Sequence, residues 1–340
     1  MVPVVRTLQQ VWPQTALTWV IGRAEAALLG DLPGVEFIIV DKRDGWRGRR
    51  ALAKLLSGRR FDVLLQMQAA LRASLLSRAI DAELRLGFDR ARARDFQWLF
   101  TNASIAPRRR QHVLDGLFGF IEALGVEERE LRWDIPIPEA DRAQVAEWLP
   151  ADAPIVAINP CSSARRLNFR NWPADRYAAV GDWAMQRGMQ VVLTGGPADA
   201  ERDYAQQIAG RMRQPPIDLV GRTSLKQLLA VLDRARVLIA PDTGPAHMAT
   251  AVGTPVVGLY ATSNPDRTGP YLSRQWVVDR YPQAIRQAFG KSVAEVGWGR
   301  RVRDPQAMAL ITVEDVVDRL AAVLGLTGSP GSTISRGNSE

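Results

Sequence analysis

The segment APDTGPAHMATAVGTPVVGLY, residues 240–260, decides how the second half of this chain folds. An apolar run ends at Pro241, a short helix of small residues is predicted from Gly244, and another apolar run follows. A strand, a turn, a helix and a further strand in this order are typical of parallel β-sheets with right-handed crossovers. Ligands of such sheets bind beyond the carboxyl ends of the strands, so the turn at residues 242–244 is a candidate site.

The residues of this turn favour an anion as the ligand. Gly244 lets a ligand approach the backbone, and the free N–H groups at the start of the helix attract negative charge. The Thr243 hydroxyl can donate a hydrogen bond, and His247 lies one turn further along the helix. The alternative is an ordinary helix start that is capped by Asp242 or Thr243. We interpret the turn as a phosphate site.

Two further strand ends offer polar side chains. The run PIVAINP is followed by the hydroxyls of Ser162 and Ser163 and by Arg170, whose guanidinium matches the geometry of phosphate oxygens. The run QVVLTGG is followed by Asp199 in the first turn of the next predicted helix. This carboxylate could accept hydrogen bonds from ribose hydroxyls, or it could simply complement the helix dipole. Phosphate and sugar contacts at three strand ends together favour a nucleotide diphosphate.

Apolar strands alternate with amphipathic helices along both halves of the chain. Strands are predicted at residues 15–22, 35–41, 61–67, 154–160, 190–196, 217–221, 237–243 and 255–260, and helices at 48–60, 69–81, 112–125, 174–188, 198–212, 224–235, 244–253 and 312–325. The last helix begins with Thr312 and Asp315 at the spacing of a capping box. The charged and proline-rich residues 127–153 are predicted to connect two α/β domains.

Composition limits the classes of protein to which the chain can belong. Of the 340 residues, 46% are apolar and 24% are charged, which is typical of globular domains. No window approaches 18 unbroken apolar residues and the N-terminus lacks the pattern of a signal peptide, so a cytoplasmic protein is expected. The single cysteine, Cys161, excludes an internal disulfide, and the two histidines give no basis for a His-rich metal site.

The net charge of +8 is concentrated in the first third of the chain. Residues 1–110 contain 19 Lys and Arg against 10 Asp and Glu, which is an excess of +9. This excess favours an anionic partner, although a solvated surface in an arginine-rich chain explains it equally well. No motif combines basic and aromatic residues in the way that nucleic-acid recognition requires, so we expect no nucleic-acid partner.

Two other motif matches are weaker, and one common nucleotide-binding motif is absent. The triplet DTG also occurs in aspartic proteases, but their chemistry needs two such triplets in β-rich lobes, and this chain has one between a strand and a helix. The letters FGKS at 289–292 match the end of a phosphate-binding loop but lack the glycine at the required upstream spacing. No G-x-G-x-x-G motif follows a predicted strand, so the dinucleotide-binding fingerprint is absent.

Three stretches of the sequence resemble the ADP-heptose:lipopolysaccharide heptosyltransferases, glycosyltransferase family 9. Residues 241–271 hold a D-T-G-x-x-H turn followed by a G-x-P-V-x-x-L-Y strand. Residues 162–173 hold S-S…R-N-W-P, and residues 194–202 read TGGPADAER. The similarity extends from about residue 3 to residue 325.

The resemblance implies a GT-B fold, in which two Rossmann-like domains with parallel sheets face a central cleft. The N-terminal domain, expected at residues 1–137, would bind the acceptor, and the C-terminal domain, at residues 138–311, would bind the ADP-sugar. The helix at residues 312–325 would pack back on the N-terminal domain. The Gly- and Ser-rich residues 326–340 are expected to be disordered.

The resemblance also implies roles for single residues, carried over by position. Thr243, Gly244 and His247 would contact the diphosphate, and Arg170 would neutralise the departing phosphate where many relatives have lysine. Asp199 would face the ribose. The full set expected to bind substrate is Ser162, Ser163, Asp199, Thr223, Asp242, Thr243, Gly244 and His247, with Thr223 near the adenine.

The start of the chain departs from the family pattern. Relatives have a strand and a glycine-rich loop ahead of the helix that here contains residues 3–6, and that loop carries the aspartate expected to deprotonate the acceptor. This sequence begins within the helix, so the first strand of the N-terminal domain and the expected base would lie upstream of Met1. We therefore name no catalytic base. We expect the chain as written to bind the ADP-sugar but not to catalyse its transfer.

The activity implied by the resemblance is an inverting transfer of heptose from ADP-heptose to the inner core of lipopolysaccharide, with no metal or other cofactor. The acceptor would be Kdo-lipid A or an already heptosylated core, reached by peripheral contact at the cytoplasmic face of the inner membrane. Two alternatives stay open. One is another nucleotide-sugar enzyme on the same fold, such as an epimerase or a different transferase, and the other is an inactive ADP-sugar binder.

Overall fold

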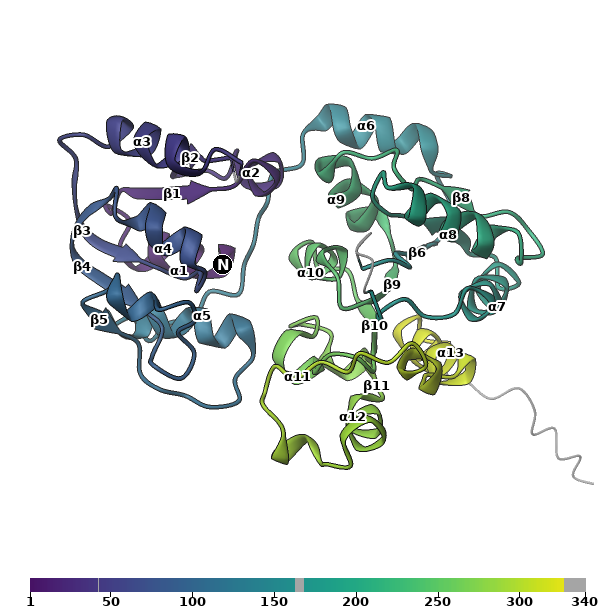
Figure 1. Ribbon diagram of the computed structural model, residues 1–340. Helices are drawn as coiled ribbons and strands as arrows, with labels where there is room; N and C mark the ends of the chain where they lie inside the picture. The colour runs from purple at the N-terminus through teal and green to yellow at the C-terminus, as the bar shows by residue number, and fades with distance from the viewer. Residues whose placement is uncertain (42, 163–167, 327–340) are drawn as a thin grey trace, which may run out of the picture. The chain divides into compact units, whose positions relative to one another are not determined.

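The chain folds into two compact α/β units (Figure 1). The computed structural model describes residues 1–41, 43–162 and 168–326. Unit 1 consists of Met1–Gln144 with the short segments Ser224–Leu229 and Asp266–Thr268, and unit 2 contains the rest of the described chain.

The described residues of unit 1 form five strands, each parallel to the strand it pairs with, and the helices that connect them. The strands are β1 Leu17–Ile21, β2 Val35–Ile39, β3 Arg60–Leu65, β4 Asp81–Gly87 and β5 Ala103–Ser104. The helices are α1 Val2–Val11, α2 Arg23–Leu29, α3 Gly45–Leu55, α4 Leu71–Ser77, α5 Val113–Glu122 and, across the boundary with unit 2, α6 Glu139–Trp148, with the 3₁₀ turn η1 at Gln97–Leu99.

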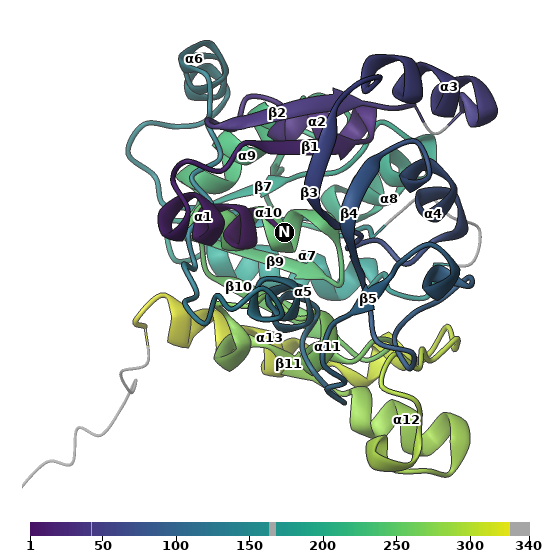
Figure 2. The same ribbon diagram turned by 90° about the vertical axis from the view of Figure 1, so that its left-hand side faces the viewer.

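The described strands of unit 1 form two separate sheets (Figure 2). β1 pairs with β2 in one, and β3, β4 and β5 pair in that order in the other. A cavity of about 790 Å³ is lined by α1, β1 and β3, with Leu8, Trp19 and Val63 among its walls. The side chains of β1 and β3 are accordingly half-buried over most of their length, unlike those of a central strand in a continuous parallel sheet.

Unit 2 is built on one six-stranded parallel sheet of order β11-β10-β9-β6-β7-β8. Its strands are β6 Ile155–Ile158, β7 Gln190–Leu193, β8 Ile217–Asp218, β9 Val237–Pro241, β10 Val256–Tyr260 and β11 Val278–Asp279. Its helices are α7 Ala174–Met185, α8 Asp199–Ala209, α9 Leu225–Arg234, α10 Gly244–Ala251, α11 Pro265–Thr268, α12 Tyr281–Phe289 and α13 Val313–Val323, with the 3₁₀ turns η2 Arg274–Trp276, η3 Val293–Glu295 and η4 Ala307–Leu310. α9 and α11 each lie partly in the short segments that are grouped with unit 1.

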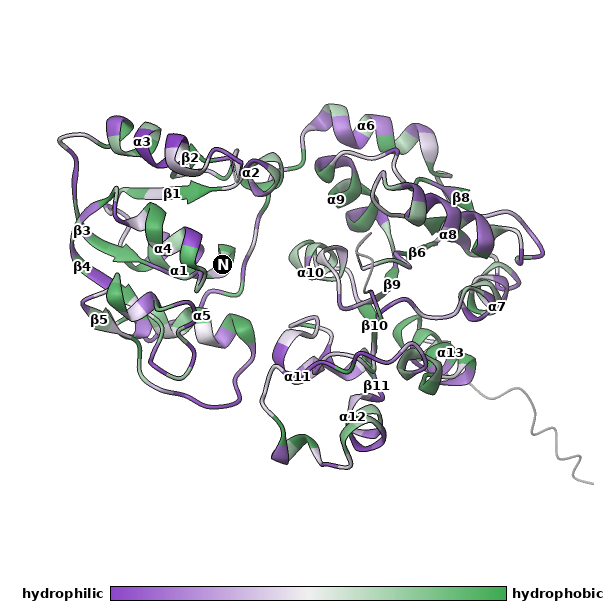
Figure 3. Ribbon diagram, viewed as in Figure 1, coloured by the Kyte–Doolittle hydropathy of each residue, from purple (hydrophilic) through white to green (hydrophobic). Residues whose placement is uncertain are grey.

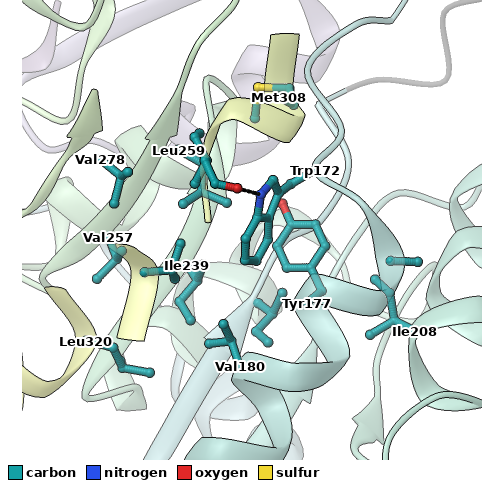
Figure 4. Close-up of a cluster of buried hydrophobic side chains, with 14 of the residues drawn as sticks. Trp172, Tyr177, Val180, Ile208, Ile239, Val257, Leu259, Val278, Met308 and Leu320 are labelled. Carbon is teal, nitrogen blue, oxygen red and sulfur yellow. Dashed lines mark hydrogen bonds between the residues drawn. The ribbon is translucent and has the colours of Figure 1, made fainter. Parts of the chain in front are cut away.

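The central strands of unit 2 are buried along their whole length. Every residue of β6, β9 and β10 is buried, because helices cover both faces of the sheet, and Figure 3 shows β9 and β10 coloured as hydrophobic. Trp172 and Tyr177 meet edge to face in the core beside this sheet, with ring centroids 5.0 Å apart (Figure 4). The Trp172 indole donates a hydrogen bond to the carbonyl of Ile311 at 3.0 Å, so the buried N–H is satisfied.

The final helix α13 packs in the core of unit 2, and its expected packing on the N-terminal domain stays a prediction. Val316 and Leu320 of α13 are fully buried in the same cluster as Trp172, and α13 contacts α7, β10 and β11. The predicted capping box is confirmed. The Thr312 hydroxyl accepts a hydrogen bond from the backbone N–H of Asp315 at 3.1 Å, and the Asp315 carboxylate accepts one from that of Thr312 at 3.0 Å.

The boundary between the two units falls within the predicted connection at residues 127–153, which also contains the unpredicted ten-residue helix α6. Val145 is the one fully buried residue of α6, so the sequence lacks the apolar stripe by which a helix is normally recognised. Residues 327–340, which cover nearly all of the tail expected to be disordered, lie outside the described part of the chain. No helix within the described ranges is long and apolar enough to cross a membrane.

The packing of α13 predicts a stability effect at Leu320. Leu320→Ala removes a fully buried side chain from the core of unit 2, so we expect the free energy of unfolding to fall by about 2–5 kcal/mol. Leu326→Ala is the matched control, since Leu326 is 46% exposed and its loss should change stability by less than about 0.5 kcal/mol. Urea denaturation followed by circular dichroism measures both, and equal effects of the two variants would contradict the observed packing.

Candidate functional site

The candidate site lies where adjacent parallel strands of unit 2 end. β6 pairs with β9 on one side and with β7 on the other, with Ile158 opposite Ile239 and Leu193. Because all these strands are parallel, their carboxyl ends lie at one edge of the sheet. The segments that follow β6, β7, β8 and β9 contain every residue expected to bind substrate.

The turn after β9 leads directly into the helix α10. Thr243 is the N-cap residue, with an extended backbone and no capping bond from its side chain, so the hydroxyl is not used as a cap. Gly244 is exposed, and a Cβ atom built on it would meet nothing within 4 Å. Pro245 in the first turn has no N–H, whereas Gly244 and Ala246 have N–H groups without helical partners. This helix start can therefore accept an anion close to the backbone.

Arg170 and Asp242 join the loop after β6 to the turn after β9. The Arg170 guanidinium donates a hydrogen bond to the carbonyl oxygen of Asp242 at 2.7 Å and lies 3.4 Å from its carboxylate. Both side chains are mostly buried, with 20% of the Arg170 side chain and 10% of the Asp242 side chain exposed. Arg170 thus lies beside the turn that the sequence favours as a phosphate site, and Asp242 holds its guanidinium in place.

Ser162 takes part in a polar network that shapes the loop after β6. Its hydroxyl donates to the Asn168 side-chain oxygen at 2.7 Å, and the Asn168 amide donates to that of Asn171 at 2.8 Å. The Asn171 amide in turn contacts the Cys161 sulfur at 3.5 Å. Ser163, the other predicted hydroxyl, lies outside the described residues.

The Cys161 thiol does not supply a nucleophile at neutral pH. Its side chain is buried, and burial, followed by the nearby charge of Glu201, raises the pKa of the thiol to about 12. The neutral thiol is therefore the form present under ordinary conditions, and it is a poor nucleophile. Its role in the loop is packing.

The carboxylate that turns towards the strand ends after β7 is that of Glu201. Glu201 accepts a hydrogen bond from the backbone N–H of Gly196 at 2.7 Å, and its charge acts on Cys161. Asp199, the acid that the sequence favoured, is exposed at the first position of α8. The sequence TGGPADAER contained this signal, because both acids fall in the first turn of the predicted helix.

The remaining two predicted residues lie at the same edge of the sheet. Thr223 follows β8 and is half-buried, and its segment is tied to the loop after β7 because the Gly221 N–H donates to the Gly195 carbonyl at 3.0 Å. His247 is exposed on α10, one turn after its first residue. Thr223 follows β8 and α10 follows β9, and the strands β6 and β7 lie between these two strands in the sheet.

Sequence reasoning missed a pair of buried polar residues behind the site. Asn159 follows β6 and donates its side-chain amide to the Thr194 carbonyl at 3.0 Å, which ties the ends of β6 and β7 together. The Asn159 side-chain oxygen is buried and has no hydrogen-bond partner among the described residues. No local pattern marks Asn159 in the sequence, because its importance comes from a neighbouring strand.

The arrangement is suited to binding an extended anionic ligand with a sugar and a base. The start of α10 follows β9, and the Arg170 guanidinium follows β6. The Glu201 carboxylate follows β7, and the Thr223 hydroxyl follows β8. Within the ranges that the structure describes, no group of three or more His, Cys, Asp or Glu side chains is placed to hold a metal ion. At the same edge, the guanidinium of Arg170 and the backbone N–H groups at the start of α10 are donors that an anion can accept.

Comparison with known proteins identifies the family that this site fits. The sequence matches the family described as Glycosyltransferase family 9 (heptosyltransferase) over residues 49–297. It is 37% identical over 317 residues to the lipopolysaccharide core heptosyltransferase OpsX of Haemophilus influenzae, covering 93% of this chain and 90% of that protein.

Solved structures show the same fold. Glycosyltransferase family 9 from Veillonella parvula superposes with a TM-score of 0.78 at 25% identity, covering 96% of this chain and 93% of that one. The Escherichia coli ADP-heptose lipopolysaccharide heptosyltransferase II superposes with a TM-score of 0.72 at 19% identity, covering 96% and 94%. The expectation of a GT-B type α/β fold with parallel sheets is confirmed.

Proposed function

Because the chain belongs to glycosyltransferase family 9, the heptosyltransferases, we propose that it transfers a heptose from ADP-heptose to the inner core of lipopolysaccharide. The observation that carries this proposal is the convergence of Arg170, the start of α10 and Glu201 at one sheet edge. This edge offers the groups that an ADP-sugar needs. The similarity to a lipopolysaccharide core heptosyltransferase supports heptose as the sugar and the core as the acceptor.

In this proposal the diphosphate binds at the start of α10. The N–H groups of Gly244 and Ala246 and the Thr243 hydroxyl donate to its oxygens, and Arg170 neutralises the charge that develops on the departing ADP. Asp242 does not touch the anion but holds the guanidinium in position. His247 adds a donor from the next turn of the helix.

The ribose and adenine would extend along the edge towards β7 and β8. Glu201 lies nearer to the strand ends than Asp199, so we assign the ribose contact to the loop that Glu201 shapes, with Asp199 at its rim. Ser162 flanks the diphosphate from the loop after β6, and Thr223 lies closest to the expected adenine position. These roles follow the order of the strands in the sheet.

The acceptor would bind to unit 1, whose arginines match its phosphates. The excess of +9 over residues 1–110 is the motivation, because the inner core of lipopolysaccharide is acidic. An acceptor carried by a membrane lipid also requires peripheral contact with the cytoplasmic membrane face. The proposal assigns no general base.

An assay of sugar transfer tests the proposal against its two alternatives. The protein is incubated with a lipopolysaccharide acceptor that lacks heptose and with ADP-heptose, ADP-glucose or a UDP-sugar in turn. Transfer from ADP-heptose alone supports the proposed activity. Transfer from another donor, or epimerisation of the donor, would assign a different nucleotide-sugar enzyme. Binding of ADP without turnover would assign an inactive binder.

Arg170→Ala is expected to weaken the binding of ADP by roughly 1.5–3 kcal/mol, since it removes a charge-assisted contact to the diphosphate. Arg187→Ala is the matched control, because Arg187 follows the distant end of α7 and lies over the ring of Trp183. Isothermal titration calorimetry measures both. An unchanged ADP affinity for Arg170→Ala would exclude the assigned phosphate contact.

Gly244→Ala is expected to change the affinity for ADP without changing the stability of the fold. The added methyl group meets nothing within 4 Å in the free protein, and the backbone of Gly244 needs no positive φ, so thermal stability should be unchanged. A diphosphate held against the start of α10 would collide with that methyl group, so ADP affinity should fall by about tenfold or more. A variant that binds ADP like the original protein would place the diphosphate elsewhere.

A further inference from the structure

One turn of unit 1 exposes two large apolar side chains. The turn η1 and the residue before it lie in the connection between β4 and β5. The side chain of Phe96 is 60% exposed and that of Leu99 is 66% exposed. Two such side chains on one short turn indicate a contact surface, in contrast to a single exposed leucine.

The backbone holds Phe96 outward in an uncommon conformation. Asp95 has a φ of 51° and Phe96 a φ of 58°, so two successive residues other than glycine lie in the left-handed region. A bulky aromatic residue rarely adopts this conformation, and such strain persists only where the surrounding structure fixes it. A turn without this backbone strain could be formed with glycine or asparagine in place of Phe96.

Hydrogen bonds fix the turn to the rest of unit 1. The fully buried side chain of Gln97 accepts from the Phe88 N–H at 3.2 Å and donates to the Gln66 carbonyl at 2.8 Å. The Asp95 carboxylate accepts from the backbone N–H of Leu71, the first residue of α4, at 3.2 Å. The exposed apolar side chains therefore stand on a rigid base.

Exposed arginines lie close to these apolar side chains in sequence, and the Trp98 ring that Arg90 covers contacts the Phe96 ring at 5.3 Å between centroids. Leu71 is itself 47% exposed, and the next residue of α4 is the exposed Arg72. Arg90 and Arg94 are exposed, and the Arg90 guanidinium lies 3.8 Å from the centre of the Trp98 ring. We call the set Leu71, Arg72, Arg90, Arg94, Phe96 and Leu99 the Phe96 surface.

We propose that the Phe96 surface docks on the anionic phospholipid surface of a membrane. Phe96, Leu99 and Leu71 enter the boundary between headgroups and acyl chains, and the arginines bind phosphate oxygens of the headgroups. Aromatic rings favour this interfacial region, and basic side chains near an anionic leaflet add electrostatic attraction. This inference rests on the proposed function, because the proposed acceptor is a membrane lipid. The Phe96 surface is then the part of the enzyme that contacts the membrane carrying that acceptor.

The size of the surface favours a lipid over a protein partner. A stable protein interface uses about 20–30 residues on each side, whereas the Phe96 surface has six members. A peripheral contact with a bilayer needs only a few inserted side chains together with basic residues. The uneven charge of the chain supports the same partner, because Arg72, Arg90 and Arg94 belong to the arginine-rich first third.

Cosedimentation of the whole protein with vesicles tests the inference. The vesicles contain phosphatidylethanolamine with one quarter phosphatidylglycerol, or phosphatidylcholine alone. We expect the original protein to bind the anionic vesicles, and the double variant Phe96→Asn/Leu99→Gln to bind them at least about tenfold more weakly. Asparagine tolerates the left-handed backbone, so this variant keeps the turn while removing the apolar surface. Leu272→Gln is the matched control, since Leu272 is 46% exposed in unit 2.

Arg90→Glu/Arg94→Glu provides a second, independent variant, and it should lose the preference for anionic vesicles. Calorimetry with ADP accompanies each variant, because the donor site in unit 2 should be unchanged by substitutions at the Phe96 surface. Failure of the donor proposal would appear as lost ADP binding in the original protein, whatever the vesicles show. Equal vesicle binding by the original protein and both double variants, or no preference of the original protein for anionic vesicles, would overturn the inference.

Discussion

Parallel pairing of β6 with β9 at the centre of the unit 2 sheet brings the loop that carries Arg170 next to the turn that carries Asp242. Both strands are completely buried, so their register cannot slip without exposing apolar side chains. The guanidinium can reach the Asp242 carbonyl oxygen only because the two strands end side by side. The proposed anion site therefore depends on the hydrophobic core beneath it.

The two units differ in how completely their sheets are formed. Unit 2 has a single six-stranded sheet with its first strand in the middle, as doubly wound sheets require. The described strands of unit 1 form two sheets, and β1 of one sheet and β3 of the other both line a large cavity. Unit 2 thus holds the polar groups of the candidate site in fixed positions at the ends of its strands. Unit 1 has exposed arginines and exposed apolar side chains.

The pattern of apolar runs was sufficient to predict most of unit 2. β6, β7, β9 and β10 are continuous apolar stretches bounded by Gly, Pro or Asp, so their positions follow from local sequence. β4 was missed although DAELRLG alternates polar and apolar residues, because its charged residues hid the strand. α6 was missed because its surface is almost entirely polar.

The sequence singled out residues in the segments that follow strands. Thr243 and Gly244 come soon after β9 and Arg170 lies in the loop after β6, and their role in binding phosphate stays a prediction. Glu201 was overlooked in favour of Asp199, because only the folded helix shows which carboxylate turns back to Gly196. The packing of α13 on unit 2 and the exposure of Phe96 depend on contacts between distant segments, which no local pattern records.

A crystal structure of the protein with ADP would test the central claim most directly. We expect the diphosphate oxygens within hydrogen-bonding distance of the N–H groups of Gly244 and Ala246 and of the Arg170 guanidinium, with the ribose towards the loop of Glu201. Arg170 should keep its contact with the Asp242 carbonyl oxygen. ADP bound at the amino ends of the strands, or in the cavity lined by α1, β1 and β3, would contradict the proposed site.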